Sequence, residues 1–550
     1  MSSRISRATF LKGLAGCGAA ALGGVAYLEW MHPNPKFPCR MLGPSKEIGH
    51  LLRDSKGLGE NVKLTDSSHA KVVIVGGGMS GLSAAWWLKR NHVDDFVLLD
   101  LESNVGGNSS SGSNDYGSYP WGAHYVPIAN PESEYVRELF KELGIITGIK
   151  ADGLASYDEL MLCHEPQERL FKDGSFHEGL VPKRGLQPDE NAEMARFFKM
   201  VVDFRNATGG DGKVAFAIPL DLSSNDPQFR KLDQITMAQW LSDNGFKSKP
   251  LRWYVNYCCR DDYGSTVENV SAWAGIHYFA GRRGVSANSE PNAVVTWPQG
   301  NGYLVERLKN PLAKHIQTDS MVAQIKDSEN GLVTIVRDSK SKQFRSIISE
   351  YVIFAAPRFV AAHVIKDMSQ NSNIAKQLSY APWMVANISI RSLPDTKGLA
   401  PAWDNVSYYS DSLGYVMANH QDISTRSKPS VITYYYPLSA NQPKTSRQEL
   451  YSSTPEHWSE LIVRDLEKVH PTIAREILSM DLWPWGHGMI RPSVGFVWGD
   501  TRQQMRARHG NILYAHSDMS GMSNFEEAQY HGVEAAKLVL QDLSAAHGKS

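Results

Sequence analysis

The chain has 550 residues, which is long enough for a large buried core and for two domains. Its formal net charge is −1, and both signs are scattered along the sequence, so the composition does not suggest a nucleic-acid partner. The five cysteines show neither metal-ligand spacing nor a disulfide framework. No apolar span reaches about 18 residues, which excludes a polytopic membrane protein.

Residues 1–31 have the composition of an export signal or membrane anchor. Basic residues precede a weakly apolar run rich in Gly and Ala, residues 13–27. The segment Ser6–Lys12 resembles the twin-arginine signal S-R-R-x-F-L-K, with Ala8 in place of the second arginine. We therefore expect the protein in the periplasm or on the outer face of the inner membrane, with its N-terminus at the membrane surface. If the altered signal does not function, or if the segment is a disordered tail, the protein is expected in the cytoplasm.

Residues 32–69 contain several early prolines and are then mostly polar, which predicts a linker and wrapping segment. The stretch 71–108 that follows has the order strand, glycine turn, helix, strand, acid. The β-branched run 72–75 predicts a strand buried on both faces. A second apolar strand, 96–99, ends at Asp100. Between these strands three glycines have G-x-G-x-x-G spacing: Gly76, Gly78 and Gly81.

Each glycine of this turn has its own physical role in a dinucleotide site. Gly76 permits the tight turn, Gly78 lets a pyrophosphate approach the backbone, and Gly81 lets the helix pack closely on the strand. The free N–H groups of the helix then face the phosphates. Asp100 lies about 19 residues beyond Gly81, near the ~20 expected of an acid that binds ribose hydroxyls. The turn residues expected at the dinucleotide are Gly76, Gly77, Gly78, Met79, Ser80 and Gly81.

A second glycine pair, Gly106 and Gly107, follows Asp100 and is itself followed by Asn108. This arrangement resembles the flavin-containing amine oxidase and phytoene desaturase superfamily, in which an acid, a spacer and Gly-Gly-Arg form a second turn at the phosphates. The resemblance implies FAD as the cofactor. Asn108 stands where the superfamily usually has arginine, so one positive charge toward the pyrophosphate is missing.

The segment Tyr119–Pro127 resembles the next motif of this superfamily, which passes beside the flavin ring. Gly122 and Ala123 would let the backbone approach the flavin, and His124 or Tyr125 would lie near its edge. The resemblance makes His124 the candidate catalytic residue, although a hydrogen-bonded structural histidine is the alternative. Polyamine oxidases can carry a glutamate near the position of Pro127, and its absence weakens a polyamine assignment.

Residues 131–290 combine helical patterns with many aromatic side chains. Arg169–Phe176 predicts a hairpin with an Asp-Gly turn, and Thr236 predicts the start of a helix. We interpret Arg260–Asp262 as a structural ion-pair cluster. Six aromatic residues fit either a substrate pocket or a helical core: Trp253, Tyr254, Tyr257, Trp273, Tyr278 and Phe279.

The chain then returns to motifs of the nucleotide domain. Trp297–Gly302 resembles the glycine turn before the adenine-side strands, and Val322 falls where a backbone contact to adenine is usual. Lys366 lies near the place of a lysine that serves flavin N5 in many amine oxidases, but its register does not fit, and we do not assign it. Residues 370–480 predict the sheet of a substrate domain, and Trp483–Pro492 predicts a Pro/Gly-rich loop.

The C-terminal region resembles the closing flavin motif of the superfamily. A strand at 511–515 leads to Asp518, which the resemblance places near ribityl or pyrophosphate oxygens. The helix that follows would begin near Glu527 and Ala528 and would direct N–H groups at the flavin, stabilising negative charge on the reduced ring. A simple loop acid is the alternative for Asp518.

The predicted fold class is α/β: a Rossmann-like FAD domain with an interleaved α+β substrate domain of the amine oxidase type. The expected FAD segments are 70–130, 291–368 and 485–550, and the expected substrate-domain segments are 131–290 and 369–484. The leading function is oxidation of a C–N bond of a small amine, with oxygen or a quinone as electron acceptor. A desaturase or isomerase of an isoprenoid-like substrate and a non-catalytic flavin-binding partner are the alternatives.

Overall fold

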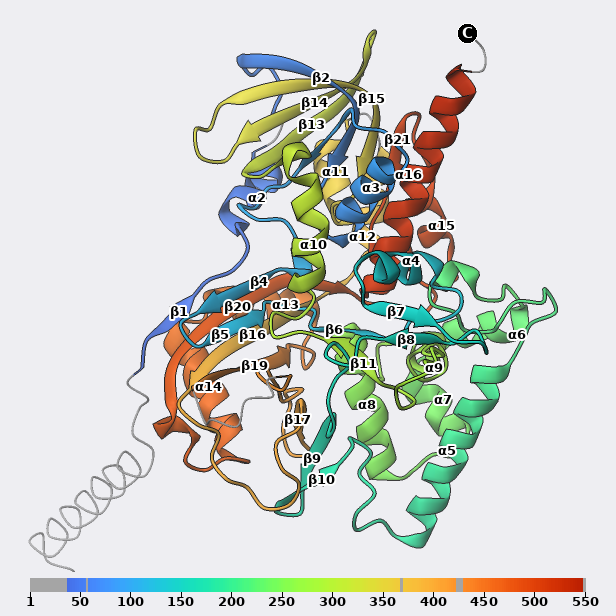
Figure 1. Cartoon of the computed structure of the whole chain (residues 1–550), viewed down its shortest axis with the longest axis vertical. Helices are drawn as coiled ribbons and strands as arrows, with labels where there is room; N and C mark the ends of the chain where they lie inside the picture. Colours follow the sequence, from blue (N-terminus) through green and yellow to red (C-terminus); the bar gives the residue numbers. More distant parts are fainter. Residues whose placement is uncertain (1–36, 56–57, 367–368, 422–428, 548–550) are drawn as a thin grey trace, which may run out of the picture.

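The computed structural model describes residues 37–55, 58–366, 369–421 and 429–547. The expected export signal and the first part of the expected linker lie outside these described residues. Figure 1 shows two β-sheets, one above the other in this view, with helices packed beside both. Among the described residues, no helix combines the length and the apolar character needed to cross a membrane.

The first sheet is the nucleotide-binding sheet predicted from the sequence. Its strand order is β12-β3-β2-β15-β14-β13, and β21 pairs with β15. The run 72–75 forms the buried end of its central strand, and each of these side chains is at most 6% exposed. The strands are β2 (Leu64–Val75), β3 (Phe96–Leu99), β12 (Ile316–Gln317), β13 (Ser320–Ser328), β14 (Gly331–Asp338), β15 (Phe344–Phe354) and β21 (Ile512–Tyr514).

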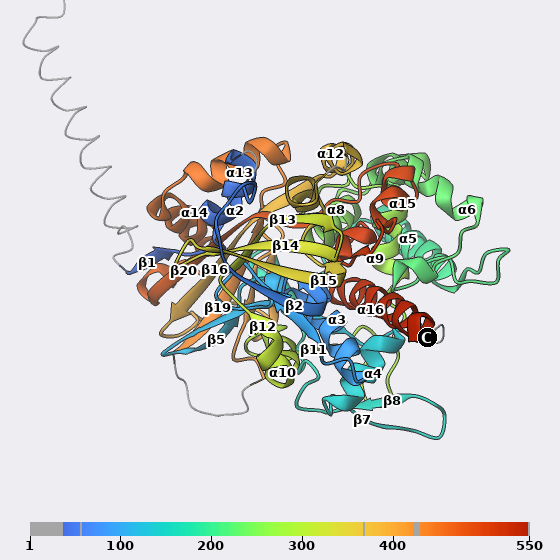
Figure 2. The same ribbon diagram turned by 90° about the horizontal axis from the view of Figure 1, so that it is seen from above.

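Helices α3 and α16 pack together against this sheet (Figure 2). Their contact is close because Gly532 has no side chain: a Cβ there would lie 2.1 Å from the carbonyl oxygen of Ser80. The helices around this sheet are α3 (Met79–Arg90), α4 (Glu134–Glu142), α10 (Gly302–Leu312) and α16 (Phe525–His547). Side chains of residues 136–162 belong to the same buried cluster as β2 and α3, although we expected this segment in the substrate domain.

The second sheet has the strand order β1-β20-β16-β19-β18-β17-β9-β10. The predicted hairpin at Arg169–Phe176 is confirmed, with positive φ at Asp173 and Gly174. Helices α13 (Pro443–Ser452) and α14 (Pro455–Glu467) pack beside this sheet. Its strands are β1 (Cys39–Met41), β9 (Glu168–Lys172), β10 (Ser175–Glu178), β16 (Tyr380–Ile390), β17 (Asp404–Ser407), β18 (Tyr415–Met417), β19 (Ser430–Pro437) and β20 (Ile477–Ile490).

The loop predicted at Trp483–Pro492 is wrong, because β20 continues to Ile490 and crosses the expected domain boundary at 484/485. Its other edge pairs with β1 only as far as Leu482. The missing N–H of Pro484 therefore falls beyond that pairing, where proline is tolerated in a strand.

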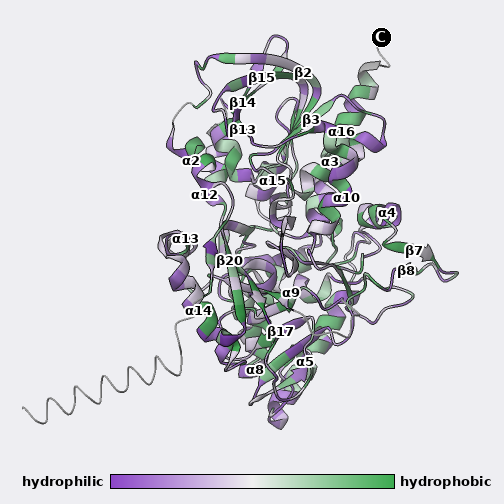
Figure 3. Cartoon of the chain, turned by 60° about the vertical axis from the view of Figure 1, so that its left-hand side comes forward, coloured by the Kyte–Doolittle hydropathy of each residue, from purple (hydrophilic) through white to green (hydrophobic). Residues whose placement is uncertain are grey.

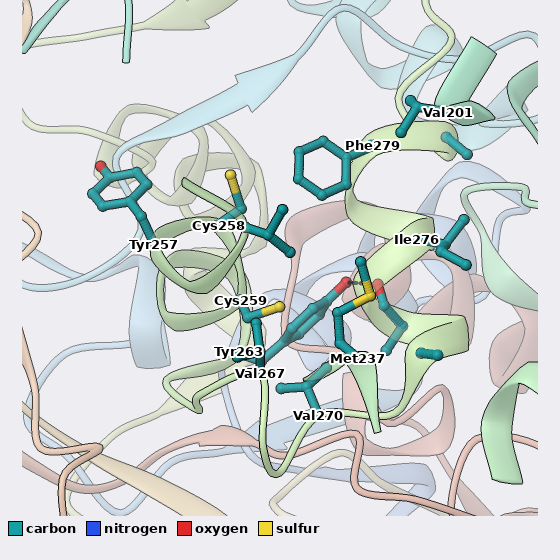
Figure 4. Close-up of a cluster of buried hydrophobic side chains, with 14 of the residues drawn as sticks. Val201, Met237, Tyr257, Cys258, Cys259, Tyr263, Val267, Val270, Ile276 and Phe279 are labelled. Atoms are coloured by element: carbon teal, nitrogen blue, oxygen red, sulfur yellow. Dashed lines mark hydrogen bonds between the residues drawn. The ribbon is translucent and has the colours of Figure 1, made fainter. Parts of the chain in front are cut away.

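A helical bundle completes the substrate-side half of the molecule. The side chain of Thr236 caps α7, as predicted, by accepting from the N–H of Gln239. Cys258 and Cys259 are buried free thiols in this core (Figure 4). The outer helices α5 and α14 alternate hydrophobic and hydrophilic residues (Figure 3). The bundle helices are α5 (Pro188–Asn206), α6 (Pro227–Arg230), α7 (Met237–Asp243), α8 (Lys249–Tyr263) and α9 (Ala272–Ala280).

Candidate functional site

The first glycine turn joins β2 to α3 and requires glycine for two different reasons. Gly76 has a φ of +103°, and a Cβ on Gly81 would lie 1.9 Å from the carbonyl oxygen of Gly76. The fold itself therefore needs these two glycines. Gly78 has an ordinary φ of −69° as the N-cap of α3. A Cβ on Gly78 would meet no atom within 4 Å, so open space lies in front of the first N–H groups of α3.

This space belongs to a cavity of about 540 Å³, here called the cleft, which is lined by residues of both sheets. Most of the residues expected at the dinucleotide line it. They are Gly76, Gly77, Gly78, Met79, Ser80, Asp100, Gly106, Gly107, Asn108, Ala123, Val322, Asp518 and Ala528.

Asp100 lies at the cleft and also closes the glycine turn. Its carboxylate accepts hydrogen bonds from the N–H groups of Gly77, at 2.6 Å, and Glu102, at 2.8 Å. Burial raises the pKa of Asp100 to about 7, although these two hydrogen bonds act in the opposite direction. The acid expected to bind ribose hydroxyls thus has a second role that the sequence did not indicate.

The second glycine turn is joined to the first. The N–H of Gly106, whose φ is +130°, donates to the carbonyl oxygen of Gly77 at 2.8 Å. The side-chain amide of Asn108 donates to the carbonyl oxygen of Gly488 on β20 at 2.5 Å. Asn108 therefore connects this turn to the second sheet and brings no charge to the cleft.

Asp518 is held as a carboxylate at the opposite side of the cleft. It accepts hydrogen bonds from the hydroxyl of Tyr380, at 2.6 Å, and from the N–H of Arg358, at 2.8 Å. Burial opposes its ionisation, but the neighbouring His516 and these hydrogen bonds lower the pKa of Asp518.

Two residues considered at the sequence level lie away from this site. Glu527 accepts from the N–H of Leu220 at 2.6 Å and from the hydroxyl of Ser520 at 2.5 Å, and it lines neither the cleft nor the cavity beside it. Each helical residue turns by about 100°, so Glu526 and Glu527 face different surroundings. Lys366 forms an ion pair with Glu60 at 2.6 Å and also lines neither cavity, so no flavin role is assigned to it.

A second cavity of about 180 Å³, here called the acidic cavity, adjoins the cleft. The two share the lining residues Asn108, Ala123, Trp485, Gly488, Ser523, Asn524 and Phe525. Its aromatic wall includes Tyr125, Tyr257, Tyr263, Tyr278, Trp383 and Tyr435. Four carboxylates also line it: Asp261, Asp262, Asp404 and Glu526. Among the described residues that line this cavity, Arg282 is the one lysine or arginine.

Arg282 has its own partners within the cavity. It donates to Asp262 at 2.7 Å and to the hydroxyl of Tyr125 at 3.0 Å. Its charge is therefore already matched by one of the four carboxylates.

In the part of the chain that the structure describes, the other three carboxylates form no ion pair with a lysine or arginine that lines the cavity, and burial makes their ionisation unfavourable. Burial raises the pKa of Asp261, and the neighbouring Asp262 adds to the effect. It raises the pKa of Glu526 to about 7. The pKa of Asp404 also lies well above its usual value, because the carboxyl is buried near other acids. A cation entering this cavity would favour the ionised forms of all three.

Gly122 and His124, expected beside the flavin, line the acidic cavity and not the cleft. The imidazole of His124 stacks on Tyr435, with ring centroids 4.7 Å apart. Burial lowers the pKa of His124 to about 4, so the ring is neutral near pH 7.

The sequence analysis missed the acidic cavity. We interpreted Arg260–Asp262 as structural, and the guanidinium of Arg260 does bond to Ser439, whereas Asp261 faces the cavity. A usable signal was the four-residue spacing of Tyr257 and Asp261, which places both on one face of α8. Of the six aromatic candidates, Tyr257 and Tyr278 line the cavity, and the others lie in the helical core or pack against it.

Comparison with known proteins supports the Rossmann-like nucleotide-binding domain and the overall fold described above. A family profile described as an NAD(P)-binding Rossmann-like domain matches residues 74–143. A flavin-containing amine oxidase A from Canis lupus familiaris is 24% identical over 297 residues, which cover 53% of this chain and 50% of that protein. The solved structure of a putrescine oxidase bound to putrescine superimposes with a TM-score of 0.64 at 14% identity, covering 86% of this chain and all of that chain. The chain has the amine oxidase fold.

The same fold also carries other chemistry. A fatty acid isomerase from P. acnes superimposes with a TM-score of 0.58 at 15% identity, covering 85% of this chain and 98% of that chain. The chain spans about half the length, or less, of the curated relatives that it matches. Fold similarity to the amine oxidases therefore has to be combined with the chemistry of the two cavities.

The cleft of this amine oxidase fold fits FAD. The open space at Gly78 lets a diphosphate reach the N–H groups of α3. Asp100 and Asp518 offer carboxylate oxygens to hydroxyl groups, and Val322 of β13, predicted to contact the adenine through its backbone, also lines the cleft. The cleft then meets the acidic cavity, where a flavin ring would face a bound substrate.

Replacing Asp100 by Ala should weaken FAD binding by about one to two orders of magnitude. The change removes charge-assisted hydrogen bonds worth roughly 1.5–3 kcal/mol each, at about 1.4 kcal/mol per tenfold. It also releases the N–H of Gly77 from its bond within the turn. Titration of the apoprotein with FAD measures the effect. Unchanged affinity would show that this carboxylate does not contact the cofactor.

Proposed function

We propose that the chain is an FAD-dependent oxidoreductase that oxidises a C–N bond of a cationic amine. One observation carries the proposal: a cavity with four carboxylates and one guanidinium shares a wall with the cofactor cleft. An aromatic wall with excess acid fits an organic cation, because rings and carboxylates both attract positive charge.

The amine is expected to lack a carboxylate. An amino acid substrate would need a free cation to hold its carboxylate, but Arg282 is already bonded to Asp262 and Tyr125. A carboxylate placed near Asp261, Asp404 and Glu526 would raise the pKa values of these groups further and would oppose their ionisation, whereas a cation would favour it.

The chain's own residues would bind the cation, exclude water and take up a proton. When bound, FAD supplies the acceptor for the hydride that leaves the carbon next to the amine nitrogen. An ammonium ion must lose a proton before its carbon can readily give up hydride. Glu526, with a pKa of about 7, matches that task near neutral pH. Neutral His124 is a second acceptor, but its low pKa makes it a weaker base.

The alternatives fit this cavity less well. A desaturase or isomerase of an isoprenoid-like substrate would call for a long apolar tunnel, and buried carboxylates would oppose such a ligand. A non-catalytic flavin-binding partner has no need for a second cavity beside the cofactor.

Location in the periplasm and the identity of the electron acceptor, oxygen or a quinone, remain predictions from the sequence.

Anaerobic mixing of the FAD-loaded protein with candidate substrates tests the proposal. Amines without a carboxylate should bleach the flavin absorbance, and the corresponding amino acids should not. Bleaching by apolar polyenes alone would favour the desaturase, and bleaching by none of these compounds would favour the non-catalytic alternative.

The rate of flavin reduction by an amine should rise with pH through about 7. Glu526 is protonated below its pKa of about 7 and ionised above it, so the base and the attraction for the cation are both gained as pH rises. Glu526→Gln should reduce this step without abolishing it, because burial also raises the pKa of Asp261, in the same cavity, to about 7. His124→Ala should slow reduction without moving the step, because His124 titrates near pH 4. Stopped-flow reduction across pH measures both, and an unchanged step in Glu526→Gln would contradict the assignment.

A further inference from the structure

A segment before the nucleotide-binding sheet crosses the cleft; we call residues 39–55 the strap. Its first part, β1, pairs with β20 of the second sheet. Arg40 adds a two-pronged ion pair to the buried Asp481, with nitrogen–oxygen distances of 2.7 and 2.8 Å. Asp481 also accepts from the hydroxyl of Tyr119 at 3.0 Å. These contacts fix one end of the strap to the second sheet.

The middle of the strap is fixed next to the first sheet. Both the N–H and the hydroxyl of Ser45 donate to the carboxylate of Glu102, just beyond β3, at 2.8 Å each. Helix α2 (Lys46–Asp54) begins there and lies at the flank of the two sheets (Figure 1). The strap residues that line the cleft are Pro44, Ser45, Lys46, Gly49, His50 and Leu52. The strap is therefore part of the cleft wall.

Lys46 is the one lysine or arginine among the described residues that line the cleft. Three carboxylates line the same cavity: Asp100, Glu102 and Asp518. The Nζ atom of Lys46 lies 4.4 Å from the ring centroid of Tyr451, another residue of the cleft. A dianionic diphosphate in this cleft would thus find a single permanent side-chain charge of opposite sign, and that charge comes from the strap.

We propose that Lys46 provides the cationic side-chain contact to the cofactor diphosphate that Asn108 cannot provide. The inference rests on the proposed FAD cofactor. Asn108 is neutral, and its amide is bonded to Gly488 of β20. Lys46 reaches the same cleft from outside the nucleotide-binding domain, on a segment anchored to both sheets. Such anchoring holds the backbone that carries Lys46 in place before the cofactor binds. The ammonium group itself lies 3.8 Å from a carboxylate oxygen of the exposed Glu47, a pair that a diphosphate could replace.

Three variants test this assignment. Lys46→Ala should weaken FAD binding by about 10- to 100-fold, and Lys46→Arg should retain most of the affinity. Arg53→Ala is the matched control, because Arg53 is a cation on the same helix that pairs with Asp54 and does not line the cleft. Affinities are measured on apoprotein by the change in flavin fluorescence. The wild-type affinity should also fall more steeply with salt than that of Lys46→Ala.

Binding measurements with ADP and with adenosine distinguish a charge contact to the diphosphate from packing against the rest of the ligand. Lys46→Ala should weaken ADP binding and leave adenosine binding unchanged, because only ADP carries the diphosphate. Equal losses for both ligands, equal losses in Lys46→Arg, or unchanged FAD affinity in Lys46→Ala would each overturn the assignment. A wild-type protein that binds no FAD would instead contradict the proposed function.

Discussion

Replacing Gly78 by Val is expected to lower FAD affinity by at least about 100-fold and to leave the apoprotein folded. A Cβ at this position meets no protein atom within 4 Å, and the backbone φ of −69° suits any residue. The added side chain would occupy the space through which a diphosphate reaches the N–H groups of α3. Loss of two charge-assisted hydrogen bonds, at roughly 1.5–3 kcal/mol each, accounts for the expected effect.

Two other glycines provide the controls for this experiment. Gly81→Ala should lower the free energy of unfolding, because its Cβ would lie 1.9 Å from a carbonyl oxygen within the turn. Gly148→Ala should change neither stability nor FAD affinity, because its Cβ would meet no atom within 4 Å and it lines neither cavity. Thermal unfolding of the apoproteins and FAD titration separate the three cases. Wild-type affinity in Gly78→Val would mean that the diphosphate does not lie at α3.

Replacing Asp261 by Asn should lower kcat/KM for a cationic amine by roughly 30- to 3,000-fold. Removing one partner of a buried charge pair typically costs 2–5 kcal/mol of binding, at about 1.4 kcal/mol per tenfold. Asp261 is half-buried beside Asp262, and Arg282 bonds to Asp262, so a bound ammonium ion would be its natural partner.

The same substitution should not destabilise the folded protein. Burial raises the pKa of Asp261, which shows that the ionised form is unfavourable in the folded state without a ligand. Asp203→Asn is the control, because Asp203 is an exposed acid that pairs with Lys199 at 3.0 Å. Steady-state kinetics with thermal unfolding measure both effects. A wild-type value of kcat/KM in Asp261→Asn would contradict the role of the acidic cavity in binding a cationic amine.

The glycine turns could be predicted from the sequence because their constraints are local. Gly76, Gly78 and Gly81 act within one strand–turn–helix unit, and Asp100 follows at the end of the adjacent strand. Asp518 also follows a strand, but the resemblance to the closing flavin motif is what indicated it. The second role of Asp100, to accept a hydrogen bond from the N–H of Gly77, could not be predicted from the sequence, because it depends on the direction of the side chain in the folded protein.

The spacing of Tyr257 and Asp261 indicates one wall of the acidic cavity, but the full set of acids could not be predicted, because they come from separate elements. Asp261 lies on α8, Asp404 on β17 and Glu526 on α16, and only the packed fold brings them together. Which side chain at the start of α16 lines the cavity could not be predicted either, since a shift of one residue turns a side chain by about 100°. Glu527 was therefore named where Glu526 lines the cavity.

Local composition led to a wrong prediction of secondary structure in one further segment. Pro484 and its neighbouring glycines favoured a loop, but pairing with β16 keeps this segment in β20. There a long-range pairing overrode the local preference. Residues 39–55, by contrast, belong to the predicted linker and wrapping segment; they contact both sheets, and several of them line the cleft.

The flavin content of the purified full-length protein tests the central claim most directly. None of the described cysteines lines the cleft, so the cofactor is expected to be held without a covalent bond to them. The account predicts yellow protein that releases one FAD per chain on denaturation. Colourless protein that takes up no FAD on refolding would contradict it.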